Sequence, residues 1–187
     1  SALQGAVNGF GSVMVTAYTT MGKLDQIVQQ PYSSMATALG TYTGQNVGAG
    51  KDKRVWQGLR AAVLINLGFT LLMFVLVALF GEQMLGVFVR DQEVIHTALM
   101  GLRINSYFYG FLGLLYAVRG VLNGAGDAVY SAINGVIELV CRLAFAFVLI
   151  PKIGPMGCFL CGGITWVLAS LVSVWRYAIG KWKTKAK

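Results

Sequence analysis

The chain has 187 residues, of which 56% are hydrophobic and only 12% are charged. Soluble domains carry about 25% charged residues, so this composition leaves too little charge to cover a water-facing surface and excludes an ordinary soluble domain. The net charge of +8 does not indicate nucleic acid, because the basic residues lie at the ends of uncharged segments and form no basic face interleaved with aromatics.

Long uncharged segments predict an all-α, polytopic membrane protein. About 20 apolar residues in a helix cross a bilayer core of roughly 30 Å, and most of the uncharged segments reach that length. We expect a six-helix bundle with helices over 1–22, 26–47, 54–80, 95–122, 128–150 and 158–179, an interfacial segment over 82–93 and a basic tail over 180–187. The sequence opens on an apolar segment without an initiator Met, so we expect a fragment whose first helix is truncated.

The first two expected helices differ in character. The segment 1–22 contains glycines at spacings that allow close helix packing, and Lys23-Leu24-Asp25 after it is expected to be an outward turn with solvated charges. The segment 26–47 is rich in polar residues and contains Pro31, which is expected to kink it. Polar residues inside a bilayer face protein or water, so this helix is expected to face a cavity. Helical spacing puts Gln30, Thr37 and Thr41 on one face, as candidate cavity-lining residues.

Two glycine-rich turns, Asn46–Asp52 and Asn123–Asp127, resemble each other, and their glycines suit left-handed helix C-caps. If the six segments alternate across the membrane, ten basic residues fall on one side and four on the other. The positive-inside rule makes the first side cytoplasmic. The first segment is then expected to start inside, and the C-terminus to be cytoplasmic in a plasma (bacterial inner) membrane.

The later segments carry the remaining site candidates. Tyr107, in the aromatic segment 95–122, is placed where it could line a pore, and Asn134 belongs to a polar stripe on 128–150. Glu138 and Arg142 lie four residues apart, the favourable orientation for a helical ion pair, and charges inside a membrane helix are costly unless paired. Two interpretations remain open: Glu138 binds a coupling cation or substrate, or the pair neutralises itself and fastens its helix to its neighbours.

Enzyme chemistry is not indicated. The chain has no H-E-x-x-H, P-loop or G-x-S-x-G motif. Cys158 and Cys161 form a C-x-x-C without a second pair or a nearby His, which favours two small packing residues over a metal or redox site. We therefore expect no enzyme, no metal and no cofactor.

Several motifs together resemble multidrug and toxic compound extrusion (MATE) transporters. These motifs are VNGFGS (Val7–Ser12), VTAYT (Val15–Thr19), GQNVGAGKDKRV (Gly44–Val55), RGVLNGAGDA (Arg119–Ala128) and GVIELVCR (Gly135–Arg142). The chain is similar to the second half of such a protein along nearly its whole length. The resemblance implies a six-helix lobe of a twelve-helix transporter that exports organic cations or amphipathic compounds in exchange for Na⁺ or H⁺. The implied partners are the lipid bilayer, the N-terminal lobe of the same polypeptide and small organic cations.

Some members of that family hold a cation with acids in their seventh and tenth helices. The segments matching those helices, 1–22 and 95–122, contain no acid, so the family's ion site is not carried over to this half by the resemblance. Two alternatives to an exporter stay open. A flippase for lipid-linked saccharides would need more basic residues facing the cavity than Arg103, Arg119 and Arg142. A non-transporting scaffold would have little use for the polar helix 26–47.

Overall fold

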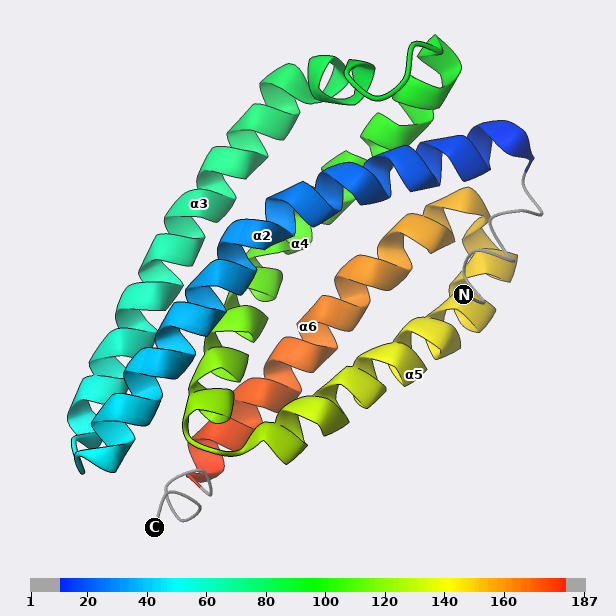
Figure 1. Cartoon of the computed structure of the whole chain (residues 1–187). Helices are drawn as coiled ribbons and strands as arrows, with labels where there is room; N and C mark the ends of the chain where they lie inside the picture. Colours follow the sequence, from blue (N-terminus) through cyan, green and yellow to red (C-terminus); the bar gives the residue numbers. More distant parts are fainter. Residues whose placement is uncertain (1–10, 181–187) are drawn as a thin grey trace. The chain divides into compact units, whose positions relative to one another are not determined.

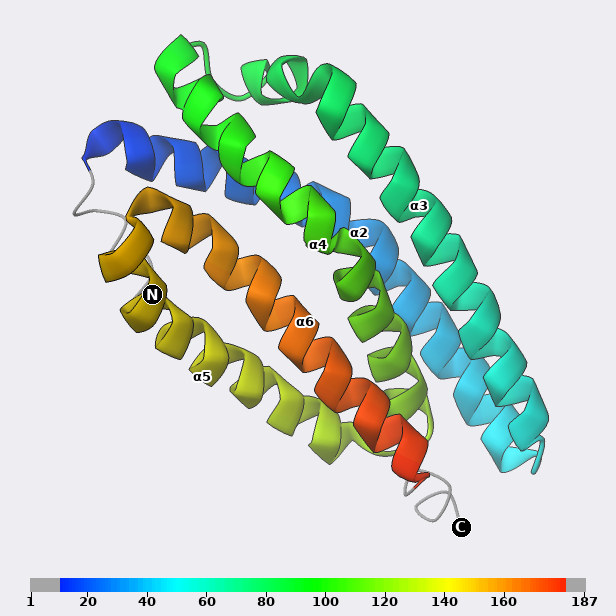
Figure 2. The same cartoon turned by 180° about the vertical axis from the view of Figure 1, so that it is seen from behind.

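The structure, a computed structural model, describes residues 11–180 and is all-α, which confirms the expected fold class. It contains five helices, shown in Figure 1 and from behind in Figure 2: α2 (Ser12–Gly48), α3 (Asp52–Gly86), α4 (Gln92–Gly124), α5 (Ala128–Ile153) and α6 (Pro155–Ile179). The last four each overlap one of the expected helices. Residues 1–10 of the first expected helix (1–22) and residues 181–187 of the expected tail (180–187) lie outside the described residues.

The expected turn at Lys23–Asp25 is wrong, because α2 runs without a break from Ser12 to Gly48 and takes the place of two expected helices. Leu24 and Asp25 are only 5% and 6% exposed, so they pack inside the protein and are not solvated turn residues. Asp25, which separates two uncharged segments of the sequence, is therefore a buried contact residue. Pro31 lies within the helix.

The expected interfacial segment over 82–93 is also wrong. Residues 82–86 continue α3, and α4 begins at Gln92, so only a short connection separates the two helices. Leu85, at the end of α3, is completely buried and holds this last turn against the core. Asp91 caps α4, since its Oδ1 accepts a hydrogen bond of 2.9 Å from the backbone N–H of Glu93.

The two turns that resemble each other in sequence have the same structure. The N–H of Lys51 donates to the carbonyl of Asn46 (2.8 Å) and that of Gly50 to Val47 (2.9 Å), with Gly50 at φ +68°. After α4, Asp127 donates to Leu122 (2.8 Å) and Gly126 to Asn123 (3.1 Å), with Gly126 at φ +83°. Both are Schellman caps that need a left-handed residue, which confirms the predicted C-caps.

Three helical segments are long and apolar enough to cross a membrane by length and composition: Asp52–Gly86, Val129–Ile153 and Pro155–Ile179. They correspond to α3, α5 and α6. The helices α2 and α4 fall outside this group because they carry more polar side chains, the feature that makes them candidates for a functional surface.

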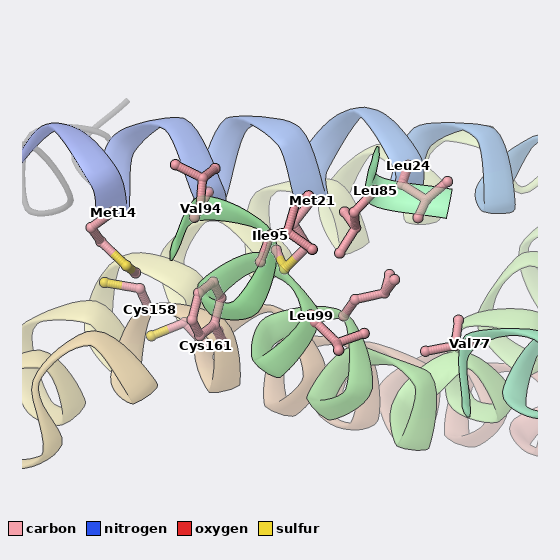
Figure 3. Close-up of a cluster of buried hydrophobic side chains, with 14 of the residues drawn as sticks. Met14, Met21, Leu24, Val77, Leu85, Val94, Ile95, Leu99, Cys158 and Cys161 are labelled. Carbon is pink, nitrogen blue, oxygen red and sulfur yellow. The ribbon is translucent and has the colours of Figure 1, made fainter. Parts of the chain in front are cut away.

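The helices contribute to two compact units, and each unit has its own core. Unit 1 comprises the described part of Ser1–Gln29 with Leu71–Tyr109 and Leu139–Thr165. Its core gathers side chains of α2, α4 and α6, among them Met21, Leu99 and the unbridged, buried Cys158 and Cys161, as Figure 3 shows. Unit 2 comprises Gln30–Thr70, Gly110–Glu138 and the described part of Trp166–Lys187. Its core includes Leu39, Val55 and Val121.

Candidate functional site

In unit 2, α2 and α4 cross in backbone contact. A Cβ atom built on Gly124 would lie 2.1 Å from the carbonyl oxygen of Gly40, and one on Gly120 would lie 2.5 Å from that of Ala36. Real Cβ atoms do not approach carbonyl oxygens so closely, so these positions require glycine. Small residues let membrane helices approach in this way.

A groove of ≈ 480 Å³ lies along this crossing. It is lined by the small residues of the crossing, Ala36, Gly40, Gly120 and Gly124. Its polar lining residues are Ser33, Thr37, Thr41, Tyr116, Arg119 and Asn123. The volume falls in the range of small-molecule sites, about 300–1,000 Å³. The structure thus places two predicted residues, Thr37 and Thr41, in one groove. Gln30 is exposed and does not line it.

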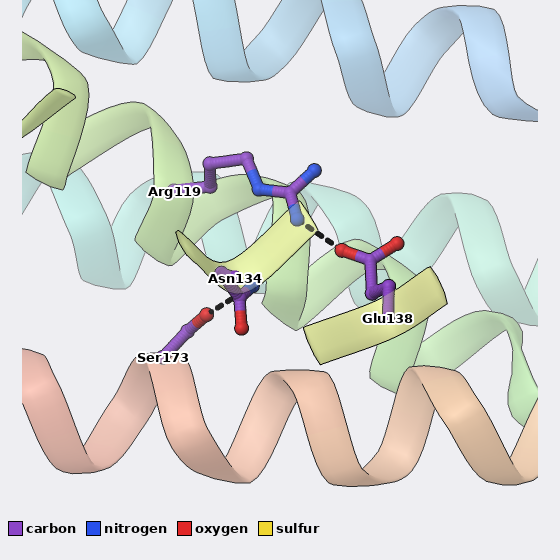
Figure 4. A network of polar contacts seen from close by, with 4 residues as sticks. All are labelled: Arg119, Asn134, Glu138 and Ser173. Carbon is purple, nitrogen blue, oxygen red and sulfur yellow. Dashed lines mark hydrogen bonds and ion pairs between the residues drawn. The ribbon is translucent and has the colours of Figure 1, made fainter. Parts of the chain in front are cut away.

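The intramembrane acid has a different partner from the one expected. Glu138 of α5 forms an ion pair with Nη2 of Arg119 on α4, drawn in Figure 4. The predicted Glu138–Arg142 pair is therefore wrong, because a long side chain of the facing helix reaches the carboxylate. Both paired side chains remain about a fifth exposed (22% and 21%), so the pair keeps access to the groove that Arg119 lines.

Arg119 also keeps an unused donor. Its Nε is buried and has no hydrogen-bond partner within the described residues. Burying such a group without a partner costs free energy. Arg142 belongs to unit 1, and its Nε is likewise buried and without a partner there.

Two other predicted cavity residues have different positions. Asn134 is 1% exposed and donates from Nδ2 to Oγ of Ser173 (3.0 Å), which fastens α5 to α6 away from the groove lining (Figure 4). Tyr107 belongs to unit 1, is 69% exposed and packs its edge against Phe74. Together with Arg103 it borders a smaller hollow of ≈ 270 Å³.

A second ion pair stabilises unit 2. The carboxylate of Asp127, completely buried, accepts a hydrogen bond of 2.8 Å from Nε of Arg176 on α6. The guanidinium of Arg176 also lies over the ring of Tyr130, 5.0 Å from its centroid. This contact joins the start of α5 to the end of α6.

Unit 1 holds a buried carboxylate that sequence reasoning took for a turn residue. Asp25 of α2 accepts a hydrogen bond from Nδ2 of Asn105 to Oδ2 and another from the hydroxyl of Tyr109 to Oδ1, both 2.6 Å. Both donors lie on α4, one helical turn apart. The spacing of Asn105 and Tyr109 on a segment without acids was the signal that could have pointed to this contact.

The fold and these sites define a class: a helical membrane protein whose polar groups face one another or a groove. The MatE family model matches residues 2–148. This match covers most of the chain, and the chain belongs to the MatE family, as its motifs suggested. The family is one of transporters, which confirms that the chain is no enzyme and is an integral membrane protein.

The chain is also similar in sequence to relatives that carry names. The chain is 26% identical over 183 residues to "Probable multidrug resistance protein YpnP" of Bacillus subtilis, covering 97% of the chain and 41% of the relative. It is 24% identical over 159 residues to "Probable multidrug resistance protein NorM" of Thermotoga maritima (83% and 34%). It is 22% identical over 140 residues to a "FAD transporter" of Shewanella oneidensis (75% and 30%).

Solved structures show the same fold. The structure of the "outward-facing conformation of a multidrug resistance MATE family transporter" superposes with a TM-score of 0.83 at 15% identity, covering 96% of the chain and 40% of that protein. A MOP superfamily transporter from Pyrococcus furiosus gives a TM-score of 0.81 at 14% identity, covering 93% and 39%. The chain thus spans about two fifths of the proteins it matches.

Proposed function

We propose that the chain is the C-terminal lobe of a secondary transporter that exports organic cations or amphipathic drugs by antiport with Na⁺ or H⁺. The N-terminal lobe of the same polypeptide completes it. Alternating access follows when the two lobes rock about a shared central site. The relatives named multidrug resistance proteins support this substrate class.

The observation that carries the proposal is the groove of unit 2. It is lined by hydroxyls, a tyrosine and Arg119, whose partner in an ion pair is Glu138. The ring of Tyr116 offers a face for an organic cation, and Glu138 offers a carboxylate that such a cation would share with Arg119. Thr37 and Thr41 donate to carbonyls of their own helix (3.1 and 3.3 Å), which leaves their hydroxyl oxygens free to accept hydrogen bonds.

We further propose a plasma (bacterial inner) membrane location with the C-terminus cytoplasmic. The two Schellman turns and the end of α6 carry the basic excess, as the positive-inside rule requires. Because α2 is one helix, its start falls on the outer side, opposite to the expectation for the first segment. Four helices follow α2, as many as were expected after the segment 26–47. The C-terminus is therefore still proposed to be cytoplasmic.

A second substrate class is favoured by Arg119. Arg119 lines the groove and carries a guanidinium, a group that suits an anionic oxygen, and one relative is named a FAD transporter. Export of a phosphate-bearing dinucleotide is therefore the second candidate. Since Glu138 already neutralises one edge of the guanidinium, we rank it below organic cations.

Efflux of a fluorescent organic cation from proteoliposomes that contain the full-length protein tests the proposal. Imposed Na⁺ and H⁺ gradients are compared with no gradient, and FAD is loaded in a parallel series. Gradient-driven efflux of the cation supports the proposal. Efflux of FAD alone would establish the second candidate, and retention of both compounds under either gradient would reject transport.

A matched pair of threonine variants tests the groove. Thr41→Leu fills the groove, so we expect a several-fold rise in KM for the cation. Thr19→Leu is the control: Thr19 is exposed on the same helix and also donates to its own backbone, at Val15, but lies in unit 1. Equal effects of both variants would remove the groove from the transport path.

A further inference from the structure

Arg103 of α4 is a cation without a partner in a helix of a membrane protein. Its side chain is exposed, and no described residue forms an ion pair with it. The acids near the connection between α3 and α4, which belong to the same unit, are Glu82, Asp91 and Glu93. A charged side chain in a membrane helix is costly unless it is paired or reaches the interface. Arg103 therefore requires a negatively charged group that the described residues do not supply.

The position of Arg103 along α4 brings its guanidinium within reach of lipid phosphates. The helix has 33 residues and is about 50 Å long. If α4 is centred across a hydrocarbon core of about 30 Å, Arg103 lies about 8 Å inside the edge nearer the α3–α4 connection. In the proposed orientation this is the outer edge. The apolar stem of an arginine spans most of that distance and lets the guanidinium lie among the headgroups.

The hollow beside Arg103 has an apolar wall. Its volume is ≈ 270 Å³, and its lining residues come from α3 (Phe74, Val77 and Ala78) and from α4 (Arg103, Ser106 and Tyr107). Helical spacing places Phe74 and Ala78 on the same face of α3 as the exposed Leu71. The apolar surface therefore continues from the hollow along α3 towards the middle of the helix, a path that suits a hydrocarbon chain.

Two side chains at the hollow can donate to an anionic oxygen. The guanidinium of Arg103 has a planar set of N–H donors that matches a phosphate. The phenol of Tyr107 is 69% exposed and forms no hydrogen bond with a described residue. Its ring packs edge-on against Phe74, with the centroids 5.3 Å apart. The hydroxyl of Ser106 already donates to the carbonyl of Arg103 (2.7 Å). A phosphodiester with acyl chains is the ligand that satisfies both donors and the apolar wall.

We propose that the hollow between α3 and α4 of unit 1 binds one anionic phospholipid, with its phosphate at Arg103 and Tyr107 and an acyl chain along Phe74 and Ala78. The net charge selects the lipid: an anionic headgroup neutralises Arg103, whereas a choline headgroup brings a cation of its own. The site uses none of the residues that line the groove of unit 2, and it does not depend on the proposed export.

Native mass spectrometry of the purified, delipidated full-length protein, titrated with phosphatidylglycerol in detergent and without drug, tests the charged part of the site. We expect Arg103→Gln to remove one bound lipid, or to weaken it at least about tenfold, because the phosphate loses its charged partner. Arg90→Gln is the matched control, since Arg90 is an exposed arginine of the same unit that does not line the hollow. This variant is expected to bind as many lipids as the unmodified protein.

A second pair of variants tests the apolar wall. Ala78→Phe fills the hollow and is expected to weaken phosphatidylglycerol several-fold. Leu79→Phe is the control, because Leu79 is the next exposed residue of α3 and does not line the hollow. Phosphatidylcholine, which has the same phosphate and chains without a net charge, is expected to bind several-fold more weakly. Inorganic phosphate is expected not to displace the lipid, because it gains nothing from the apolar wall.

Unchanged phosphatidylglycerol binding in Arg103→Gln or in Ala78→Phe would overturn the site. An equal loss in a variant and its control would overturn it as well, because the effect would then not be local to the hollow. Displacement by inorganic phosphate would replace the lipid with a free anion, and equal binding of the two lipids would remove the selection by charge. Because binding is measured without substrate, the site can fail while efflux persists, and it can persist in a protein that exports nothing.

Discussion

The two units hold their buried carboxylates in opposite ways. In unit 2, Asp127 and Glu138 are each paired with an arginine, Arg176 and Arg119. In unit 1, Asp25 receives two short hydrogen bonds from an amide and a phenol. A guanidinium cancels the charge of its carboxylate, whereas neutral donors leave it. The difference separates carboxylates paired with an arginine from a carboxylate held by an amide and a phenol.

The same two helices also meet differently in each unit. In unit 2, α2 and α4 touch through glycines, backbone to backbone. In unit 1, they are joined by hydrogen bonds from α4 to Asp25. A glycine contact tolerates no added atom, while a polar contact can exchange partners. Unit 2 is therefore expected to be the more sensitive to added side-chain volume where α2 meets α4.

The largest expected effect comes from breaking the ion pair of unit 2 whose carboxylate, that of Asp127, is completely buried. Arg176→Met removes the arginine from the buried carboxylate of Asp127, which costs about 3–5 kcal/mol in free energy of unfolding. Equilibrium unfolding of the purified full-length protein in SDS–detergent micelles measures it. Arg90→Met, at an exposed position, is the control. A loss below about 1 kcal/mol would show that water reaches Asp127.

The glycine crossing is the next test. Gly124→Ala puts a methyl group where the carbonyl of Gly40 lies, so the helices must separate, at a cost of about 3 kcal/mol. The control is Gly48→Ala, because Gly48 has open space around its Cβ position and lies at the end of α2. The same unfolding assay compares them. If both variants unfold alike, the close contact of α2 with α4 is incorrect.

Local composition was enough to predict much of this fold. Apolar length predicted α3, α5 and α6, and the glycines of Asn46–Asp52 and Asn123–Asp127 predicted their caps, because helix formation and capping depend on near neighbours in the chain. Thr37 and Thr41 were found on one face from helical spacing alone.

The errors concern contacts between residues far apart in the chain. Asp25 was taken for a turn residue because its donors lie 80 and 84 positions away, at Asn105 and Tyr109. Glu138 was paired with Arg142 by spacing along one helix, but Arg119, 19 positions away on α4, is the partner. Local periodicity does not reveal which helix faces a buried charge, so the two sites required the structure.

Removal of one donor from Asp25 is expected to have an intermediate effect. Tyr109→Phe deletes a hydrogen bond to a buried carboxylate, which costs about 2 kcal/mol. The same unfolding assay measures this loss. Tyr107→Phe, at an exposed tyrosine, serves as the control. A loss no larger than that of the control would show that the phenol of Tyr109 contributes little to holding the carboxylate.

The smallest stability effect is expected at the groove. Glu138→Gln removes one charge of a pair that is about a fifth exposed. Water compensates Arg119 in part, so the free energy of unfolding falls by about 1 kcal/mol or less. Efflux is the more sensitive measurement of what Glu138 does. If Glu138 shares its charge with an organic cation, KM rises several-fold while a neutral amphipathic substrate is exported as before. Unchanged export of both substrates, with the small loss of stability, would class Glu138 with Asp127 as a carboxylate that only joins helices.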